Sequence, residues 1–102
     1  MIAERVLMSY KSAMKIHIIR PATVCGISPR MRLDVAVNLL TFQGLSKNKI
    51  TVLGGSQVRP NIHIDDMCDL YKKLIGADIS NFNGEIFNAG SQNLKIKEIA
   101  KL

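Results

Sequence analysis

The chain has 102 residues and a net charge of +6, and 47% of its residues are apolar. This length allows one domain at most, and the apolar share is ordinary for a globular protein. No apolar run reaches the roughly 18 to 20 residues that a membrane helix needs, and the first residues lack a signal-peptide core. We therefore expect a cytoplasmic protein without a membrane partner.

Hydrophobic spacing and turn residues predict an alternation of helices and strands. The predicted helices span residues 2–14, 35–45, 65–75 and 95–102. The predicted strands and extended segments span residues 15–20, 50–53, 58–64 and 85–88. Between them lie predicted loops over 21–34 and 78–84 and predicted turns over 54–57 and 89–94. This alternation is typical of an α/β fold with a partly parallel sheet.

Three residues are expected to fix the ends or the position of these elements. Asp34 and Asp65 each precede a helical pattern, and a carboxylate there can accept hydrogen bonds from the first free backbone amides, so both are predicted N-caps. Pro60 interrupts an extended segment and has no N–H to donate. Its strand is therefore predicted to lie at a sheet edge or to cross between layers.

The cysteines and histidines do not form a recognisable metal or disulfide pattern. Cys25 and Cys68 are far apart in the sequence, and their flanks lack metal-ligand spacing. Two distant histidines, His17 and His63, do not complete a zinc site. We expect no metal and two cysteines that pack as small apolar side chains.

The positive charges are scattered along the chain and do not form a run. No aromatic ladder accompanies them, so the pattern favours solvated faces over a nucleic-acid surface. A basic interaction domain that binds nucleic acid or protein stays open as one alternative function.

Residues 54–66 form the most informative segment, in which a glycine turn, one arginine and two aspartates surround a short apolar strand. The planar guanidinium of Arg59 suits a phosphate or a carboxylate. The residue types alone also fit an exposed arginine that pairs with Asp65 or Asp66, so both interpretations remain open at this point.

Three segments, in order and spacing, resemble the NAD-dependent sugar-nucleotide epimerases and dehydratases, the extended short-chain dehydrogenase group. Residues 54–66 resemble the family's Gly-x-Gly-x-x-x-Arg-x-x-x-His-Val-x-Asp segment, and residues 19–26 resemble its Leu-Arg-Pro-x-Asn-Val-Tyr-Gly segment. Residues 87–91 and the helix after them resemble the family's late strand and its following helix. The resemblance covers nearly the whole chain.

The resemblance implies an α/β fold made of the last strands of a Rossmann-like sheet and part of a small α/β substrate-binding domain. Residues 1–102 would form a single fragment. Residues 1–26 and 62–90 would be the last part of the cofactor-binding sheet with its helices, and residues 27–61 and 91–102 would be the substrate-binding part.

The resemblance also implies which side chains meet ligands. The NAD cofactor would lie against residues of the first loop, which are Pro21, Ala22, Thr23 and Val24. The sugar nucleotide would be bound chiefly by Arg59, which matches the arginine that grips the diphosphate. The other residues implied at the substrate are Arg32, Asn38, His63 and Asp66.

No catalytic residue is expected in this chain. It has neither the Gly-x-x-Gly-x-x-Gly dinucleotide motif nor the Tyr-x-x-x-Lys pair of the family, and Glu4 matches a glutamate that follows the catalytic lysine. We therefore expect a substrate-side fragment that is inactive alone, whose partner is a missing N-terminal cofactor domain, and whose exposed strand edges favour self-association. A non-catalytic module that binds a nucleotide or another anion is the second alternative.

Overall fold

Two pairs of parallel strands organise the fold. The computed structural model describes residues 1–77 and 82–102. The strands form two sheets, one with the order β1-β4 and one with the order β2-β3-β5. Strands β1 and β4 are parallel, β2 and β3 are parallel, and β5 is antiparallel to β3. The strands are β1 (His17–Pro21), β2 (Thr23–Cys25), β3 (Val58–His63), β4 (Glu85–Ala89) and β5 (Gln92–Lys95). The predicted α/β class with a partly parallel arrangement is confirmed.

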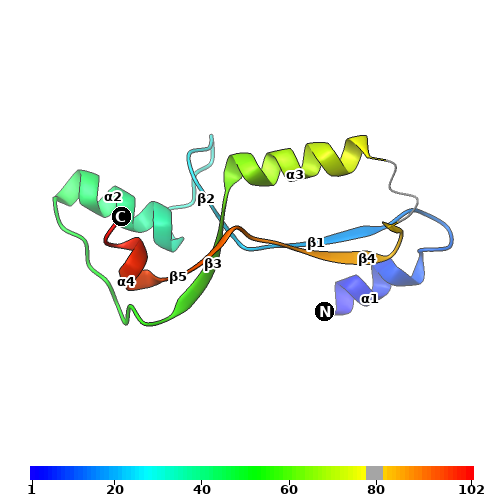
Figure 1. Cartoon of the computed structure of the whole chain (residues 1–102), viewed down its shortest axis with the longest axis horizontal. Coiled ribbons are helices and arrows are strands. Elements are labelled where there is room, and N and C mark those ends of the chain that lie inside the picture. Colours follow the sequence, from blue (N-terminus) through cyan, green and yellow to red (C-terminus); the bar gives the residue numbers. More distant parts are fainter. Residues whose placement is uncertain (78–81) are drawn as a thin grey trace.

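The helices lie on different sides of an elongated molecule. They are α1 (Ile2–Ser9), α2 (Ala36–Lys47), α3 (Ile64–Gly76) and α4 (Ile96–Ile99). Figure 1 shows α3 on one side of the β1-β4 sheet and α1 on the other, with α2 and α4 at the opposite end of the molecule. The principal extents are 54 × 25 × 20 Å. No helix among the described residues is both long and apolar enough to cross a membrane.

A small apolar core lies where the chain passes from one sheet to the other. Its buried members are Ile62, Met67 and Ala89, from β3, α3 and β4. At the same place the N–H of Ala22 donates to the C=O of Ala89 over 2.7 Å. Burial of these side chains therefore joins the loop after β1 to the end of β4, although 67 positions separate Ala22 from Ala89 in the sequence.

The predicted helix over residues 2–14 is too long, because α1 ends at Ser9. The Ser9 hydroxyl donates to the C=O of Val6 over 2.7 Å. The amide of Tyr10 donates to Leu7, three residues back, so the helix tightens into turns at this point. The predicted helix over 95–102 is shortened in a similar way, since only Ile96–Ile99 are helical.

The two predicted aspartate caps are wrong. Helix α2 begins after Val35, because the Asp34 carboxylate is engaged by Arg32 over 2.6 and 3.0 Å and does not reach the helix amides. Helix α3 is capped by His63, whose Nδ1 accepts a hydrogen bond from the N–H of Asp65 over 3.3 Å. At α2 the aspartate is paired with Arg32 and no side chain caps the helix, whereas at α3 the imidazole of His63 takes the capping position.

Two predicted irregular segments contain strands, and one predicted strand does not form. The loop over 21–34 contains β2, and the turn over 89–94 contains most of β5. These strands are only three and four residues long, and they exist because they pair with the distant β3. Residues 50–53 are not a strand: the N–H of Thr51 donates to Oε1 of Gln43 in α2. Of the predicted loop over 78–84, residues 78–81 lie outside the described residues.

The strand that contains Pro60 is not at the edge of its sheet, but its pairing explains why a proline is tolerated there. Strand β3 lies between β2 and β5, so it is not an edge strand. However, β2 pairs only with residues 61–63 of β3, while β5 pairs with residues 58–61. Pro60 therefore has a partner strand on one side only, and its missing N–H removes no bond from the ladder.

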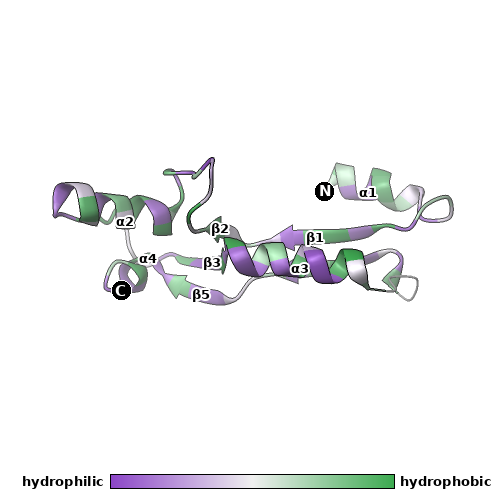
Figure 2. Cartoon of the chain, turned by 90° about the horizontal axis from the view of Figure 1, so that it is seen from above, coloured by the Kyte–Doolittle hydropathy of each residue, from purple (hydrophilic) through white to green (hydrophobic). Residues whose placement is uncertain are grey.

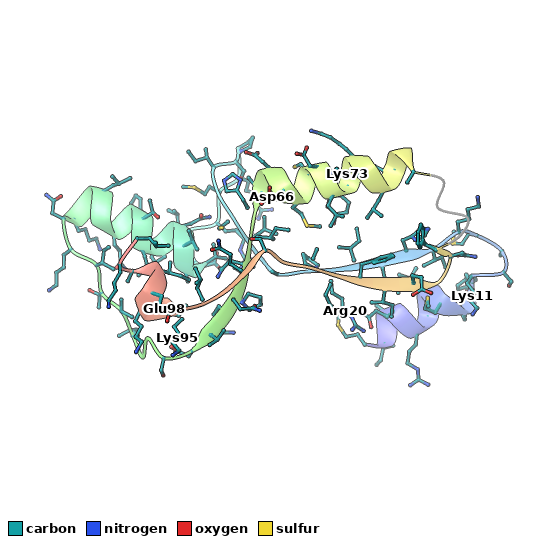
Figure 3. The ribbon with its side chains drawn as sticks, viewed as in Figure 1. Lys11, Arg20, Asp66, Lys73, Lys95 and Glu98 are labelled. Carbon is teal, nitrogen blue, oxygen red and sulfur yellow. The ribbon has the colours of Figure 1, made fainter. Side chains whose placement is uncertain are left out.

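Helix α1 is tied to β1 by a two-point ion pair. The Nε and Nη2 atoms of Arg20 donate to the two carboxylate oxygens of Glu4, each over 2.8 Å, and Figure 3 shows Arg20 beside this helix. These hydrogen bonds, with a second contribution from the α-amino group of Met1, lower the pKa of Glu4 from 4.5 to about 2. The charged carboxylate is thus favoured in the folded state.

This pair predicts a loss of α1 docking in acid. Because the folded-state pKa of Glu4 is below its unfolded value, the stabilisation is complete above pH 4.5 and is lost as the pH falls towards about 2. We expect Glu4→Gln to remove this pH dependence from the amide resonances of α1, with Glu85→Gln, at an exposed strand position, as the control. A Glu4 carboxyl that titrates near 4.5 in a ¹³C NMR titration would contradict the prediction.

Candidate functional site

A cavity of about 450 Å³ lies along the second sheet and brings together residues from four parts of the chain. Strand β3 contributes Arg59, β2 contributes Thr23, and the segment before β3 contributes Gln57. Apolar residues of α2 and of the segment over 51–53 form much of the remaining wall, among them Leu39 and Leu53, and Asp34 adds a carboxylate that is paired with Arg32. The cavity therefore combines one cation, one paired acid and uncharged polar groups with apolar side chains, as small-ligand sites commonly do.

Arg59 is an exposed residue that lines this cavity. Its side chain makes no ion pair and no hydrogen bond with the part of the chain that the structure describes. In particular it does not pair with Asp65 or Asp66, which was the competing interpretation of this segment. Its backbone C=O accepts a hydrogen bond from Nδ2 of Asn61 over 2.9 Å, which holds the strand at this position.

Arg32 and Asn38 do not line this cavity. Arg32 pairs with Asp34, and this contact holds the pKa of Asp34 below its usual value. Asn38 is buried in α2, its Oδ1 accepts from the N–H of Gly26 over 3.0 Å, and its Nδ2 donates to the C=O of Arg32 over 2.9 Å. Each polar group of Asn38 already has a partner, so this residue shapes the loop over 26–32.

A second cavity of about 370 Å³ contains His63 and Asp66 together with Cys25. Nδ1 of His63 accepts from the amide of Asp65, so Nε2 carries the proton of the neutral ring and can donate to a ligand. Asp66 lies in the first turn of α3 (Figure 3). Burial raises the pKa of the Cys25 thiol, which favours a packing role over a nucleophilic one.

The four residues expected at the cofactor do not share one cavity. Pro21 and Ala22 line a third cavity of about 460 Å³, together with residues 88–93. Thr23 lines the first cavity beside Arg59. Val24 packs against the apolar core. Pro21 and Ala22 thus line one cavity and Thr23 lines another.

Asn61 and Gln57 line the first cavity and were not predicted as site residues. Asn61 stands two positions after Arg59 in a strand, and asparagine is uncommon in strands. Residues two apart share a face of the sheet. This spacing was the signal that could have identified Asn61, whereas nothing local distinguishes Gln57 from the rest of its turn.

These features define an α/β protein with parallel strand pairs and a candidate ligand cavity that contains one cation without an ion pair among the described residues. Residues 1–90 match the NAD dependent epimerase/dehydratase family. The chain belongs to this family, whose members use NAD.

Solved structures of epimerases and dehydratases are similar to this chain over most of its length. A UDP-glucuronic acid 4-epimerase from Bacillus cereus, bound to UDP-4-deoxy-4-fluoro-glucuronic acid and NAD, is 30% identical, with a TM-score of 0.76 over 92% of this chain and 30% of that one. Pal from Bacillus thuringiensis is 25% identical, with a TM-score of 0.79 over 97% of this chain and 33% of that one.

A more distant structure supports the fold alone. The dTDP-glucose 4,6-dehydratase from Bacillus anthracis is 18% identical, with a TM-score of 0.76 over 97% of this chain and 32% of that one. The expectation of a partial Rossmann-like sheet is therefore confirmed. The chain spans about a third of the length of these structures.

Proposed function

We propose that this chain is the substrate-side part of an NAD-dependent sugar-nucleotide epimerase or dehydratase and is inactive alone. The observation that carries the proposal is Arg59, a guanidinium without an ion pair among the described residues, in a cavity of about 450 Å³. Family membership supports it, as does the similarity to an epimerase solved with a UDP-sugar and NAD.

Each part of the first cavity has a role in this proposal. The fork of Arg59 donates two parallel hydrogen bonds to the diphosphate, which is the geometry that a guanidinium offers to phosphate oxygens. Gln57 and the Thr23 hydroxyl provide uncharged polar contacts on either side of Arg59. Leu39 and the buried Leu40 form an apolar wall that limits the access of water on the α2 side of the nucleotide and so strengthens the charged contact.

The second cavity and the loop after β1 have supporting roles. Nε2–H of His63 and the Asp66 carboxylate offer a donor and an acceptor to sugar hydroxyls. Arg32 and Asn38 hold the loop over 26–32 against this region. Pro21 and Ala22 would form a wall of the NAD site, where the bound cofactor would supply hydride transfer in the whole enzyme.

We propose the following division of the chain between the two halves of the whole enzyme. Residues 1–26 and 62–90 belong to the cofactor side, and they contain β1, β2, β4, α1 and α3. Residues 27–61 and 91–102 belong to the substrate side, with α2, α4, β5 and most of β3. The absent N-terminal cofactor domain would be the partner of the first set.

Calorimetry with a UDP-sugar tests the proposed role of Arg59. We expect saturable binding, and we expect Arg59→Ala to weaken it by about 10- to 150-fold, because a charged hydrogen-bonded contact contributes about 1.5 to 3 kcal/mol. Arg30→Ala is the matched control, since Arg30 is exposed and lines none of the three cavities. Equal weakening in both variants would point to net charge and against a site.

A turnover assay tests the inactive-alone claim. Wild-type chain with NAD and a UDP-sugar should give no product, and NAD-dependent turnover would overturn the claim. A non-catalytic module that binds a nucleotide would use the same cavity. The in-frame coding sequence upstream of Met1 distinguishes this function from the enzyme fragment, because an encoded Tyr-x-x-x-Lys favours the enzyme fragment. The charge of +6 favours a basic interaction domain only if DNA or RNA binding falls steeply with salt.

A further inference from the structure

The side chain of Asn61 holds an unusual buried acceptor. Asn61 is only 6% exposed. Its Nδ2 donates to the C=O of Arg59, but its Oδ1 has no hydrogen-bond partner in the described part of the chain. Buried polar side-chain atoms almost always have a partner, so an exception calls for an explanation.

The backbone around Asn61 is held firmly. Its own C=O accepts hydrogen bonds from both the N–H and the hydroxyl of Ser91, over 3.0 and 3.1 Å. Strand β2 pairs on one side, with Thr23 in register, and β5 pairs on the other, with Gln92 in register. The unpaired Oδ1 is therefore a fixed acceptor on a rigid element, which is the arrangement that selective ligand contacts need.

Asn61 also lies beside the proposed phosphate-binding residue. It lines the same cavity as Arg59 and Thr23, and it lines the second cavity with His63 as well. Residues two apart on a strand point to one face and are separated by about 6.5 Å along it. Asn61 is thus the next side chain on this face of β3 in the direction of His63, where a sugar attached to a diphosphate at Arg59 would extend.

We propose that Asn61 is a specificity-determining residue whose Oδ1 accepts a hydrogen bond from a hydroxyl of the sugar next to the diphosphate. This inference rests on the proposed function, because it takes Arg59 as the diphosphate contact. A ligand that lacks a hydroxyl donor there leaves the buried acceptor unpaired and binds more weakly.

The test compares UDP with UDP-glucose by calorimetry on the whole chain. Wild type should prefer UDP-glucose by about 3- to 10-fold, the effect of one neutral hydrogen bond. Asn61→Ala should lose this preference while it keeps its affinity for UDP, because Arg59 is intact. Asn61→Asp keeps acceptor oxygens, so its preference should persist although its affinity for both ligands falls.

The outcomes separate the two proposals. An Asn61→Ala variant that binds both ligands and retains the preference overturns the role of Asn61 and leaves the proposed function intact. A wild-type chain that binds neither ligand overturns the proposed function and this inference with it. Should the alanine variant fail to fold, the wild type alone decides: the Asn61 side-chain amide resonances should shift with UDP-glucose and not with UDP, and identical shifts with both ligands overturn the role.

Discussion

The 102-residue chain on its own is expected to melt over a broad range at low temperature and to associate as its concentration rises. No described side chain of any size is less than 2% exposed, and the radius of gyration is 17.1 Å, whereas a compact chain of this length has about 13 Å. Large apolar side chains stand in solvent on several elements, among them Ile2, Leu45 and Ile75, each more than 80% exposed.

These exposed groups accompany unpaired strand edges. Among the described residues, strands β1 and β4 pair only with each other, so each leaves an unpaired edge, and α1 has no buried residue. Figure 2 shows apolar stretches in β1 and in helices α1 and α2. Several large apolar side chains of these helices remain exposed. Exposed edges and apolar patches are the features by which isolated pieces of sheet associate.

Calorimetry and light scattering measure this expectation directly. A scan should show a weak, broad unfolding transition, and the mass by light scattering should increase with concentration. Charged substitutions at Ile2 and Leu45 are the matched test, because they should reduce association without touching the candidate site. A monomer at all concentrations with one sharp, high-temperature transition would show that the chain forms a sufficient core alone.

The sequence predicted those elements whose signals are local. Helix α3 and strands β1, β3 and β4 lie within one or two residues of their predicted ranges, because spacing, β-branching and glycine act within a few positions. Strands β2 and β5 were missed because their stability comes from pairing with β3, far along the chain. The caps were wrong for a related reason: Arg32 takes the Asp34 carboxylate away from the helix amides, and the His63 imidazole takes the amide of Asp65.

The candidate site shows the same division between local and distant information. Arg59 stood out by its residue type and by its motif, and in the structure it lines a cavity with Thr23. No local signal indicates that Asn38 and Arg32 each already have protein partners. The importance of Asn61 appears only when burial and an unpaired acceptor are known for the same side chain.

Gly26→Ala is expected to have the largest effect of any single substitution near the site. Gly26 has a φ of +118°, which side chains rarely tolerate, and an added Cβ would lie 2.8 Å from Nε2 of His63 and 3.0 Å from Cγ2 of Ile64. A strained backbone costs about 1 to 3 kcal/mol, and crowding in a packed region adds about 1 to 3 kcal/mol. We expect a loss of at least about 2 kcal/mol in the free energy of unfolding.

The same substitution should also disturb the site, because Gly26 connects three of its parts. Its N–H donates to Asn38, and it follows Cys25, the register partner of His63. A methyl group here pushes the imidazole away from the Asp65 amide, so the cap of α3 and the second cavity change together.

Urea midpoints by circular dichroism measure the loss of stability, and exchange of the Asp65 amide measures the change at the helix cap. Gly44→Ala is the control: its Cβ would lie 3.5 Å from Ile50 in mid-helix, where alanine is favoured, so its midpoint should stay or rise. Equal midpoints for the two variants would mean that the close approach of β2 to His63 is not needed for folding.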